Sequence, residues 1–284
     1  MKTLLIGYGN IAKIHAKYLE AGGKQWDWYD PHVDGGIDYP DNLDCYDSIF
    51  ILTPERTHYD IHQQLRNSGY EQRIFVEKPA ALRWEDFGIF KDSNIFVGLV
   101  ERYNPAVQTL LKHCDSEKII NVDFSRCCVA EHSSEASLVE DLGIHDLDLF
   151  LQITKLAGLE HQKYRAAVSD VKAQLVGNTC VATITGPVIG RFIWSKDTYF
   201  KERRIVVRQN DCTFEVDLQE QTVVKHYYHE GKIVSESLYV EKSSPIANEQ
   251  NAFFCGDAQE DIEQSHDLLL RLIDIEQTVK NNKK

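Results

Sequence analysis

An acid and a base stand side by side at Glu77 and Lys78, directly after the apolar run 73–76 and before Pro79. A run of this length is typical of a buried parallel strand. The carboxyl ends of such strands are where open α/β sheets bind ligands, and a lysine there can stabilise negative charge on a substrate oxygen. The competing interpretation is a solvated pair of opposite charges on the surface, which does no chemistry.

A second group with catalytic potential lies in the segment 140–151, which has helical spacing. Asp141, His145 and Asp148 fall at i, i+4 and i+7 on one side of that helix, and the other side is mostly apolar. Neighbouring carboxylates raise the basicity of an imidazole and can hold it in one orientation, which suits acid/base chemistry near neutral pH. The alternative is a solvated acidic face without a chemical role.

A glycine-rich turn near the start of the chain could hold phosphates. It joins the strand-like run 3–6 to helical spacing over 11–19. Gly7 permits a tight turn, Gly9 allows the backbone to approach a pyrophosphate, and Ala12 allows close packing of helix on strand. The free N–H groups of the helix start face the phosphates. The residues expected to bind the cofactor here are Gly7, Gly9, Asn10 and Ile11. The same pattern also fits an ordinary glycine turn of an α/β domain.

An acidic residue follows the next predicted strand, 25–29. Asp30 lies about 20 residues after the glycines, where a carboxylate accepts hydrogen bonds from the adenosine ribose. The 2′-phosphate of NADP would bring negative charge next to this carboxylate, and His32 is the only nearby group that could compensate it. The sequence therefore favours NAD over NADP. Asp27, inside the strand, is the competing acid.

A further strand, 48–52, ends in a turn at the same edge of the predicted sheet, and helical spacing resumes after it. Its turn contains polar groups that can contact a nicotinamide cofactor, although a histidine at a helix start also serves as a capping or packing residue. The candidates for cofactor binding at these strand ends are Thr53, Pro54, His58, Glu77 and Lys78.

Composition limits the possible partners. The chain has 284 residues, which suits two domains, and a net charge of −13, which argues against nucleic acid or anionic membrane as the main partner. We find neither a run of 18 apolar residues nor a signal-peptide pattern, so a cytoplasmic location is expected. The seven cysteines form no CxxC pair, which indicates reduced thiols and no metal site.

Two domains are expected. Residues 1–116 read as an α/β, Rossmann-type doubly wound parallel sheet. Residues 117–284 are predicted to form an α+β domain with an open, mostly antiparallel sheet. We expect this domain to bind the substrate and to form a homo-oligomer, a dimer or tetramer. The C-terminal helix of the domain, 261–278, can pack back on the first domain. The strand candidates of the second domain are 118–129, 163–175, 179–185, 188–195, 203–209, 212–218, 222–228 and 233–240.

Taken together, these motifs resemble the glucose-fructose oxidoreductase/inositol dehydrogenase (Gfo/Idh/MocA) family. The matching elements are Gly7-x-Gly9-x-x-Ala12-x-x-His15, Asp30-Pro31, Thr53-Pro54-x-x-x-His58, Glu77-Lys78-Pro79 and Asp141-x-Gly143-x-His145-x-x-Asp148. The resemblance implies an oxidoreductase that uses NAD(P) to interconvert a hydroxyl and a ketone of a sugar or cyclitol. It further implies that Lys78 contacts the substrate hydroxyl and that His145 is the acid/base, with Asp141 beside it.

A narrower resemblance covers residues 98–106, which are similar to the Glu-Arg-Phe-Asn-Pro-Ala stretch of UDP-N-acetylglucosamine 3-dehydrogenases. It implies a nucleotide-sugar substrate. The substrate-binding residues that follow from it are Glu101, Arg102, Tyr103 and Asn104, together with Lys78 and His145. The alternatives are a dehydrogenase for a free sugar or inositol, an enzyme of the same fold acting on a different substrate such as a dihydrodiol or biliverdin, and a non-catalytic sensor of sugar or cofactor.

Overall fold

Parallel pairing of five short apolar strands builds the first sheet, in the order β2-β1-β3-β4-β5. The strands are β1 (Lys2–Ile6), β2 (Gln25–Tyr29), β3 (Ser48–Ile51), β4 (Arg73–Glu77) and β5 (Ile95–Gly98). The central strand β3 is buried along its whole length, as its continuous apolar sequence predicts. The computed structural model describes residues 1–129, 137–156, 161–168, 170–259 and 262–281.

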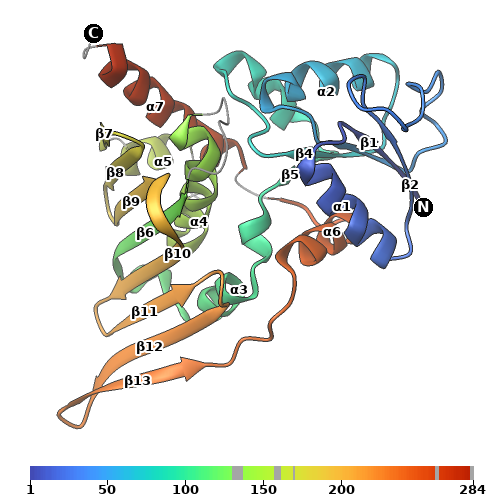
Figure 1. Cartoon of the computed structure of the whole chain (residues 1–284). Helices are drawn as coiled ribbons and strands as arrows, with labels where there is room; N and C mark the ends of the chain where they lie inside the picture. Colours follow the sequence, from blue (N-terminus) through green and yellow to red (C-terminus); the bar gives the residue numbers. More distant parts are fainter. Residues whose placement is uncertain (130–136, 157–160, 169, 260–261, 282–284) are drawn as a thin grey trace. The chain divides into compact units, whose positions relative to one another are not determined.

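Helices cover both faces of this sheet. In Figure 1, α1 (Asn10–Ala21) and α6 (Pro245–Cys255) lie on one face, and α2 (His58–Asn67) lies on the other. Helix α1 ends at Gly22, which follows its last residue and donates to the carbonyl of Tyr18. Large apolar residues are not what brings α1 close to the sheet. Ile14 is exposed, and small residues at Ala12 and Ala16 make the close contact instead. Short 3-10 helices connect the strands at Glu55–Thr57, Trp84–Lys91 and Val100–Tyr103.

Eight strands form the second sheet, in the order β13-β12-β11-β10-β6-β9-β8-β7. Only β6 and β9 pair in parallel, so the sheet is mostly antiparallel, as predicted. The strands are β6 (Ile119–Val129), β7 (Asp170–Val176), β8 (Thr179–Thr185), β9 (Ile189–Ser195), β10 (Asp197–Gln209), β11 (Cys212–Asp217), β12 (Thr222–His229) and β13 (Lys232–Leu238).

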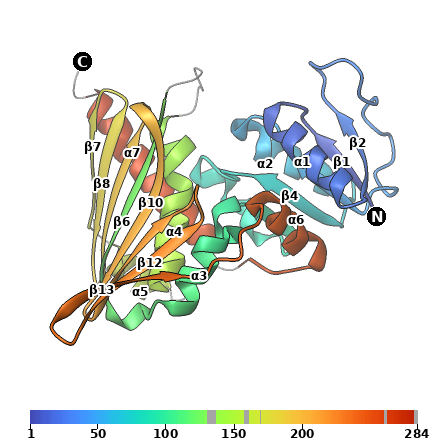
Figure 2. The same ribbon diagram turned by 60° about the horizontal axis from the view of Figure 1, so that its bottom comes forward.

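The helices that accompany this sheet are α3 (Pro105–His113), α4 (Ile144–Thr154), α5 (His161–Ala167) and α7 (Ile262–Asn281), with a 3-10 turn at Ser116–Lys118 and a π-helical turn at Val139–Gly143. Figure 2 shows α4 and α7 on one face of the sheet. Phe150 of α4 packs edge-on against Phe192 of β9, which stacks on Phe124 of β6. These aromatic rings form the core under the sheet.

The strand predicted over 163–175 is wrong in its first part, where α5 is found. Tyr164, Ala167 and Val168 are buried at i, i+3 and i+4, which is the spacing of a helix face. The strand β7 starts only at Asp170. The C-terminal helix was predicted to start at residue 261, which lies outside the described residues, and α7 is found from Ile262 onward.

Contacts between Cα atoms divide the chain into two units. Unit 1 is Met1–Val100 with Ile246–His266, and unit 2 is Glu101–Pro245 with Asp267–Lys284. The division falls at Val100 rather than at residue 116, because Glu101 and the helix α3 have their contacts in unit 2. Part of the C-terminal region, including α6, packs with unit 1. Among the described residues, no helix has both the length and the apolar character needed to cross a membrane.

Candidate active site

The glycine turn of unit 1 has the backbone geometry that a phosphate-binding loop requires. Gly7 has φ +91°, and a Cβ at this position would lie 2.8 Å from the carbonyl oxygen of Leu52, so only glycine fits. Gly9 is the N-cap of α1, and a Cβ there would meet open space. Asn10 and Ile11 follow in the first turn of the helix, whose leading N–H groups point away from the helix body. The loop therefore fits a pyrophosphate.

Asp30, at the end of β2, is held rigidly by main-chain donors. Its Oδ2 accepts from the amide of Tyr8 at 2.8 Å, and its Oδ1 accepts from the amide of His32 at 2.8 Å. The Tyr8 ring stacks on Trp28 of the same strand at 4.0 Å, which fixes the glycine turn against β2. The carboxylate keeps further lone pairs with which it can accept hydroxyl donors.

The competing acid, Asp27, has a different environment. Its carboxylate forms an ion pair with Lys2 at 2.6 Å and accepts a hydrogen bond from the Tyr46 hydroxyl at 2.8 Å. Burial would raise the pKa of Asp27, but these two contacts hold it below its usual value. Asp27 thus has structural partners, whereas Asp30 lines the cavity described next.

A cavity of about 900 Å³ opens at the carboxyl edge of the first sheet. It is lined by the glycine turn, by the region after β2 that includes Asp30, and by the start of α2. Of the described residues that line it, none is Lys or Arg, and two, Asp30 and Asp60, are acids. The described lining thus offers no cationic side chain to neutralise a bound anion. The residues that line the cavity are Ile6, Gly7, Gly9, Tyr29, Asp30, Pro31, His32, Tyr39, Leu52, Thr53, Pro54, Thr57, Asp60, Ile61 and Gln64.

The loop after β3 is fixed by side chains of its own residues. Thr53 and Thr57 share a hydrogen bond of 2.7 Å, and Thr57 also donates to the carbonyl of Pro54. His58 is only 1% exposed, and its Nε2 and Nδ1 lie 2.8 Å and 2.9 Å from the carbonyl oxygens of Thr53 and Pro79. His58 was predicted to bind the cofactor. Because its ring is buried between two loops, we assign it to positioning those loops, which corresponds to the packing alternative.

Lys78 follows β4 at the same edge of unit 1, and the peptide bond between Lys78 and Pro79 is cis. The carboxylate of Glu77 is held at both oxygens. Oε1 lies 3.0 Å from Nε2 of His15, and Oε2 accepts from the main-chain amide of Lys78 at 3.0 Å. The predicted acid and base thus do emerge at the sheet edge together. Glu77 accepts from the backbone of the lysine, and its other oxygen faces His15, so its carboxylate has structural partners.

The helix of unit 2 that carries His145 starts with an unusual turn. A π-helical turn at Val139–Gly143 precedes α4, and such turns often occur at functional sites. A Cβ at Gly143 would come within 3.4 Å of the Trp194 ring, so the glycine allows the turn to pack closely on the sheet. His145 lies in the first turn of α4 and is half-buried.

The carboxylates around His145 do not form a solvated acidic face. Asp141, predicted to orient His145, forms an ion pair of 2.7 Å with Lys196. Asp148 is 1% exposed and binds both Nε and Nη2 of Arg102. The alternative of a solvated face is therefore wrong. Lys196 lies between β9 and β10, far from Asp141 in the sequence, and no local pattern could have identified it.

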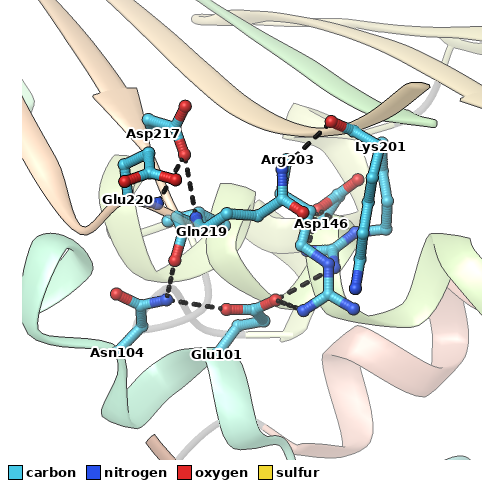
Figure 3. A network of polar contacts seen from close by, with 10 residues as sticks. Glu101, Asn104, Asp146, Lys201, Arg203, Asp217, Gln219 and Glu220 are labelled. Atoms are coloured by element: carbon cyan, nitrogen blue, oxygen red, sulfur yellow. Dashed lines mark hydrogen bonds and ion pairs between the residues drawn. The ribbon is translucent and has the colours of Figure 1, made fainter. Parts of the chain in front are cut away.

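A buried network of charges supports the base of α4. Arg126 of β6 donates to Asp146 at 2.7 Å and to Glu101 at 3.0 Å, and all three residues are almost fully buried. Trp194 donates from its indole nitrogen to the other oxygen of Asp146. Arg203 of β10 reaches Glu101 at 3.1 Å. Figure 3 shows Arg203 and Asn104 directed toward the carboxylate of Glu101.

The pKa values in this network follow from its charges. Burial would raise the pKa of Glu101, but the charges of Arg126 and Arg203 more than offset it and hold that pKa below its usual value. Burial alone would lower the pKa of Arg126, whereas Asp146 and Glu101 raise it. Glu101 and Arg126 are therefore both charged, and each of these two charges has a partner.

The predicted substrate residues Glu101, Arg102 and Asn104 have structural partners in unit 2. Glu101 belongs to the charge network, and Arg102 binds Asp148. Asn104 caps α3 through the amide of Ala106 and donates to the carbonyl of Leu218. Their burial, at most 8% exposed, argues for roles in positioning rather than in direct substrate contact. Tyr103 is half-buried.

No group of three or more residues able to bind a metal ion is found within the part of the chain that the structure describes. The residues that sequence reasoning missed are Asp60, Arg126, Trp194, Lys196, Arg203 and Gln250. Lys196 lies between two strands, and the others belong to helices or strands. For all of them except Asp60, which lines the cavity, the partner described above lies elsewhere in the chain.

Comparison with known proteins places this arrangement among dehydrogenases. The chain is 23% identical over 256 residues to a UDP-N-acetylglucosamine 3-dehydrogenase of Acidithiobacillus ferrooxidans, with 81% of this chain and 78% of that protein covered. A solved structure of that organism's UDP-N-acetylglucosamine 3-dehydrogenase GnnA is similar at a TM-score of 0.81 and 20% identity, over 97% of this chain and 96% of the other. No model of a protein family matches the chain.

Other solved structures share the whole fold. A dehydrogenase from Chromobacterium violaceum is similar at a TM-score of 0.76 and 12% identity, covering 100% of this chain and 98% of the other. A levoglucosan dehydrogenase in complex with NADH and L-sorbose is similar at 0.73 and 13% identity, covering 99% and 97%. The fold is that of these dehydrogenases, one of which was solved with NADH. These relatives agree with the resemblance drawn from the motifs, which was to the Gfo/Idh/MocA family of oxidoreductases.

Proposed function

We propose that this protein is an NAD-dependent oxidoreductase that transfers a hydride between nicotinamide and a hydroxyl or ketone carbon of a sugar. A nucleotide sugar of the UDP-N-acetylglucosamine type is the first candidate substrate. The relative named above that is a UDP-N-acetylglucosamine 3-dehydrogenase supports this choice, as does the segment 101–104. NADP is the less favoured cofactor.

The observation that carries the proposal is the cavity at the carboxyl edge of the first sheet. It combines a glycine turn that only glycine can form, a fixed acid at Asp30, and a lining without Lys or Arg among the described residues. These features fit the pyrophosphate and the ribose of NAD. When bound, NAD supplies the hydride acceptor for oxidation, and the protein supplies binding and electrostatics.

The chemistry on the sugar is assigned to side chains of this chain. In the oxidation direction, His145 accepts the hydroxyl proton of the substrate as general base. The ammonium group of Lys78 donates to the same oxygen and stabilises the negative charge that develops on it. In reduction, His145 returns the proton to the oxygen. The Asp141–Lys196 ion pair, one turn before His145, provides the charged surroundings of the base.

The test is turnover with a panel of alcohols. The purified protein is mixed with NAD or NADP and with UDP-sugars, free sugars and inositols, and reduced nicotinamide is followed by its absorbance. We expect NAD reduction with at least one UDP-sugar. Two results together would refute the proposed enzymatic activity and support a non-catalytic sensor. These are absence of turnover with every alcohol and cofactor binding that is unaltered in Lys78→Ala and His145→Ala. Preference for NADP would refute the role of Asp30.

We also propose that the protein forms a homo-oligomer, a dimer or tetramer, through the open face of the second sheet. Ile193 and Val181 are paired neighbours on that face and are 43% and 45% exposed. Charged side chains beside them are already paired within the sheet, since Asp123 binds both Arg191 and Arg208. Paired charges cost less to bury than isolated ones. A cytoplasmic location stays a prediction of the sequence.

A further inference from the structure

We propose that Gln250, on α6, is a positioning residue for Lys78 and acts through His15 and Glu77. The inference rests on the proposed function in one respect, namely that Lys78 contacts the substrate. All four residues belong to unit 1, although Gln250 lies more than 170 positions after Lys78 in the sequence. The chain of contacts is Gln250 to His15, His15 to Glu77, and Glu77 to the main chain of Lys78.

The hydrogen-bond partners of Gln250 fix the orientation of its amide group. Its Nε2 lies 3.0 Å from the main-chain oxygen of His15 and 3.0 Å from Nδ1 of the same residue. A carbonyl oxygen only accepts, so the side of the amide that faces it must be the nitrogen. The two hydrogens of that nitrogen are then used by the two acceptors on His15.

This orientation selects one form of the His15 ring. Since Gln250 donates to Nδ1, Nδ1 must carry a lone pair, and the ring proton must sit on Nε2. Nε2 lies 3.0 Å from Oε1 of Glu77, which accepts this proton. A doubly protonated ring would direct its Nδ1–H against the N–H of Gln250. Gln250 therefore keeps His15 in the neutral Nε2–H form.

The other end of the chain of contacts reaches the lysine. With Oε1 held by His15, the carboxylate of Glu77 directs Oε2 to the amide of Lys78 at 3.0 Å. The orientation of the Lys78 backbone, and with it the starting point of its side chain, is thereby tied to the His15 ring. His15 is fully buried and packs edge-on against both Phe50 and Phe75, so the ring has little freedom to turn.

Contacts of helix α6 with the first sheet hold Gln250 next to His15. Phe253 is one turn after Gln250, on the same face, and its ring packs edge-on against Phe50 and Phe75. Arg73, at the start of β4, stacks over Phe253 and donates to the main-chain carbonyl of Asp257 beyond the helix. Gln250 is 3% exposed. The helix thus presents its amide to His15 from a fixed position.

The first experiment determines which nitrogens of the His15 ring carry a proton. Nitrogen NMR of isotope-labelled histidine, assigned with the His15→Asn variant, distinguishes the two tautomers and the doubly protonated ring. We expect the Nε2–H tautomer in the wild-type protein and a loss of this single form in Gln250→Met. A wild-type signal from the Nδ1–H tautomer or from a doubly protonated ring would overturn the proposal, and this measurement needs no variant of α6 and no substrate.

The second experiment measures catalysis with a matched control. Gln259 also comes from the C-terminal part of unit 1, and its amide binds both polar main-chain groups of Val97 on β5. We expect Gln250→Met to lower kcat roughly tenfold or more, because misplacement of a reacting group is costly, and to leave the KM for NAD unchanged. Gln259→Met should keep kcat. An equal loss of kcat in both variants, or a wild-type kcat in Gln250→Met, would contradict the proposal.

Failure of the proposed function and failure of the inference about Gln250 give different experimental results. If no alcohol is turned over, the proposed function fails, while the ring measurement still confirms or refutes the role of Gln250 in fixing His15. If turnover is found and the ring is in another form, the proposed function stands and this inference is wrong.

Discussion

Asp30 illustrates how a carboxylate can be prepared for a ligand by the main chain. The amides of Tyr8 and His32 each hold one of its oxygens, so the carboxylate is already oriented before any ligand binds. In the function proposed above, this fixed charge accepts hydrogen bonds from the ribose and disfavours a 2′-phosphate.

We expect Asp30→Asn to weaken NAD binding roughly tenfold, because a charged hydrogen-bond acceptor is replaced by a neutral one, and to raise the relative affinity for NADP. Fluorescence titration with each cofactor measures the affinities for NAD and NADP. The control is Asp27→Asn, which removes an acid bonded to Lys2 and Tyr46. It should affect stability and not the choice of cofactor. A shift in cofactor preference in the control would contradict the assignment.

For the two proposed catalytic residues, we expect separate losses in kcat. Lys78→Met should lower kcat by roughly a hundredfold, since it removes a charge that stabilises the transition state. His145→Gln should cause a loss of similar size by removing the general base. Steady-state kinetics with the active UDP-sugar, together with NAD titration, tests both variants. Weakened NAD binding with an unchanged kcat would contradict the roles.

At the scale of elements, His58 connects the loop after β3 to the loop after β4. Burial lowers the pKa of His58 below its ordinary value of 6.5, and the carbonyls of Pro79 and Thr53 offset this only in part. The unfolded chain therefore binds a proton more readily than the folded protein does. Between the lowered pKa and 6.5, stability must rise with pH.

We expect the free energy of unfolding to be constant above the unfolded pKa and to fall as the pH drops through the window below 6.5. His62 contributes in the same direction, because burial also lowers its pKa. In His58→Gln the pH dependence should shrink and not vanish. Urea unfolding across this range measures the slope. A slope that is identical in wild type and variant would show that His58 is not the source.

The charge network beneath α4 gives a prediction for unit 2. Arg126→Met leaves Glu101 and Asp146 buried without their shared partner, and we expect a loss of about 3–5 kcal/mol in stability. The matched control is Arg204→Met on β10, where the partly exposed ion pair with Glu215 should contribute about 0–1 kcal/mol. Denaturant unfolding of both variants measures the two losses of stability. Equal losses would show that the network stabilises unit 2 no more than an exposed ion pair does.

At the scale of the whole molecule, the proposed oligomer can be tested by adding charge to the open face of the second sheet. Ile193→Glu should shift the protein to monomers, because it places an unpaired carboxylate in the interface. Ile14→Glu on α1 is a control of nearly equal exposure, 42% against 43%, and should leave the assembly unchanged. Light scattering after size-exclusion chromatography gives the mass. A monomeric wild type would refute the proposal.

Most of the fold could be predicted from local patterns. The strand 179–185 matches β8 residue for residue, because alternation and a glycine turn mark it directly. The segment 163–175 could not be resolved, since β-branched residues follow a short helix whose burial depends on distant partners. For the same reason the sequence placed Asp141 beside His145 and could not show Lys196. Motifs identify the residues at strand ends, whereas ion pairs between distant elements depend on the tertiary fold.

The chain passes from one unit to the other three times, after Val100, after Pro245 and after His266. Unit 1 therefore cannot complete its aromatic core until Phe253 has been made, because that ring packs on Phe50 and Phe75. At a synthesis rate of about 5–20 residues per second, the nascent first sheet waits roughly 8 to 30 seconds for this ring after residue 100 has been added. Until then, the surfaces of Phe50 and Phe75 that Phe253 covers in the folded protein stay without this partner.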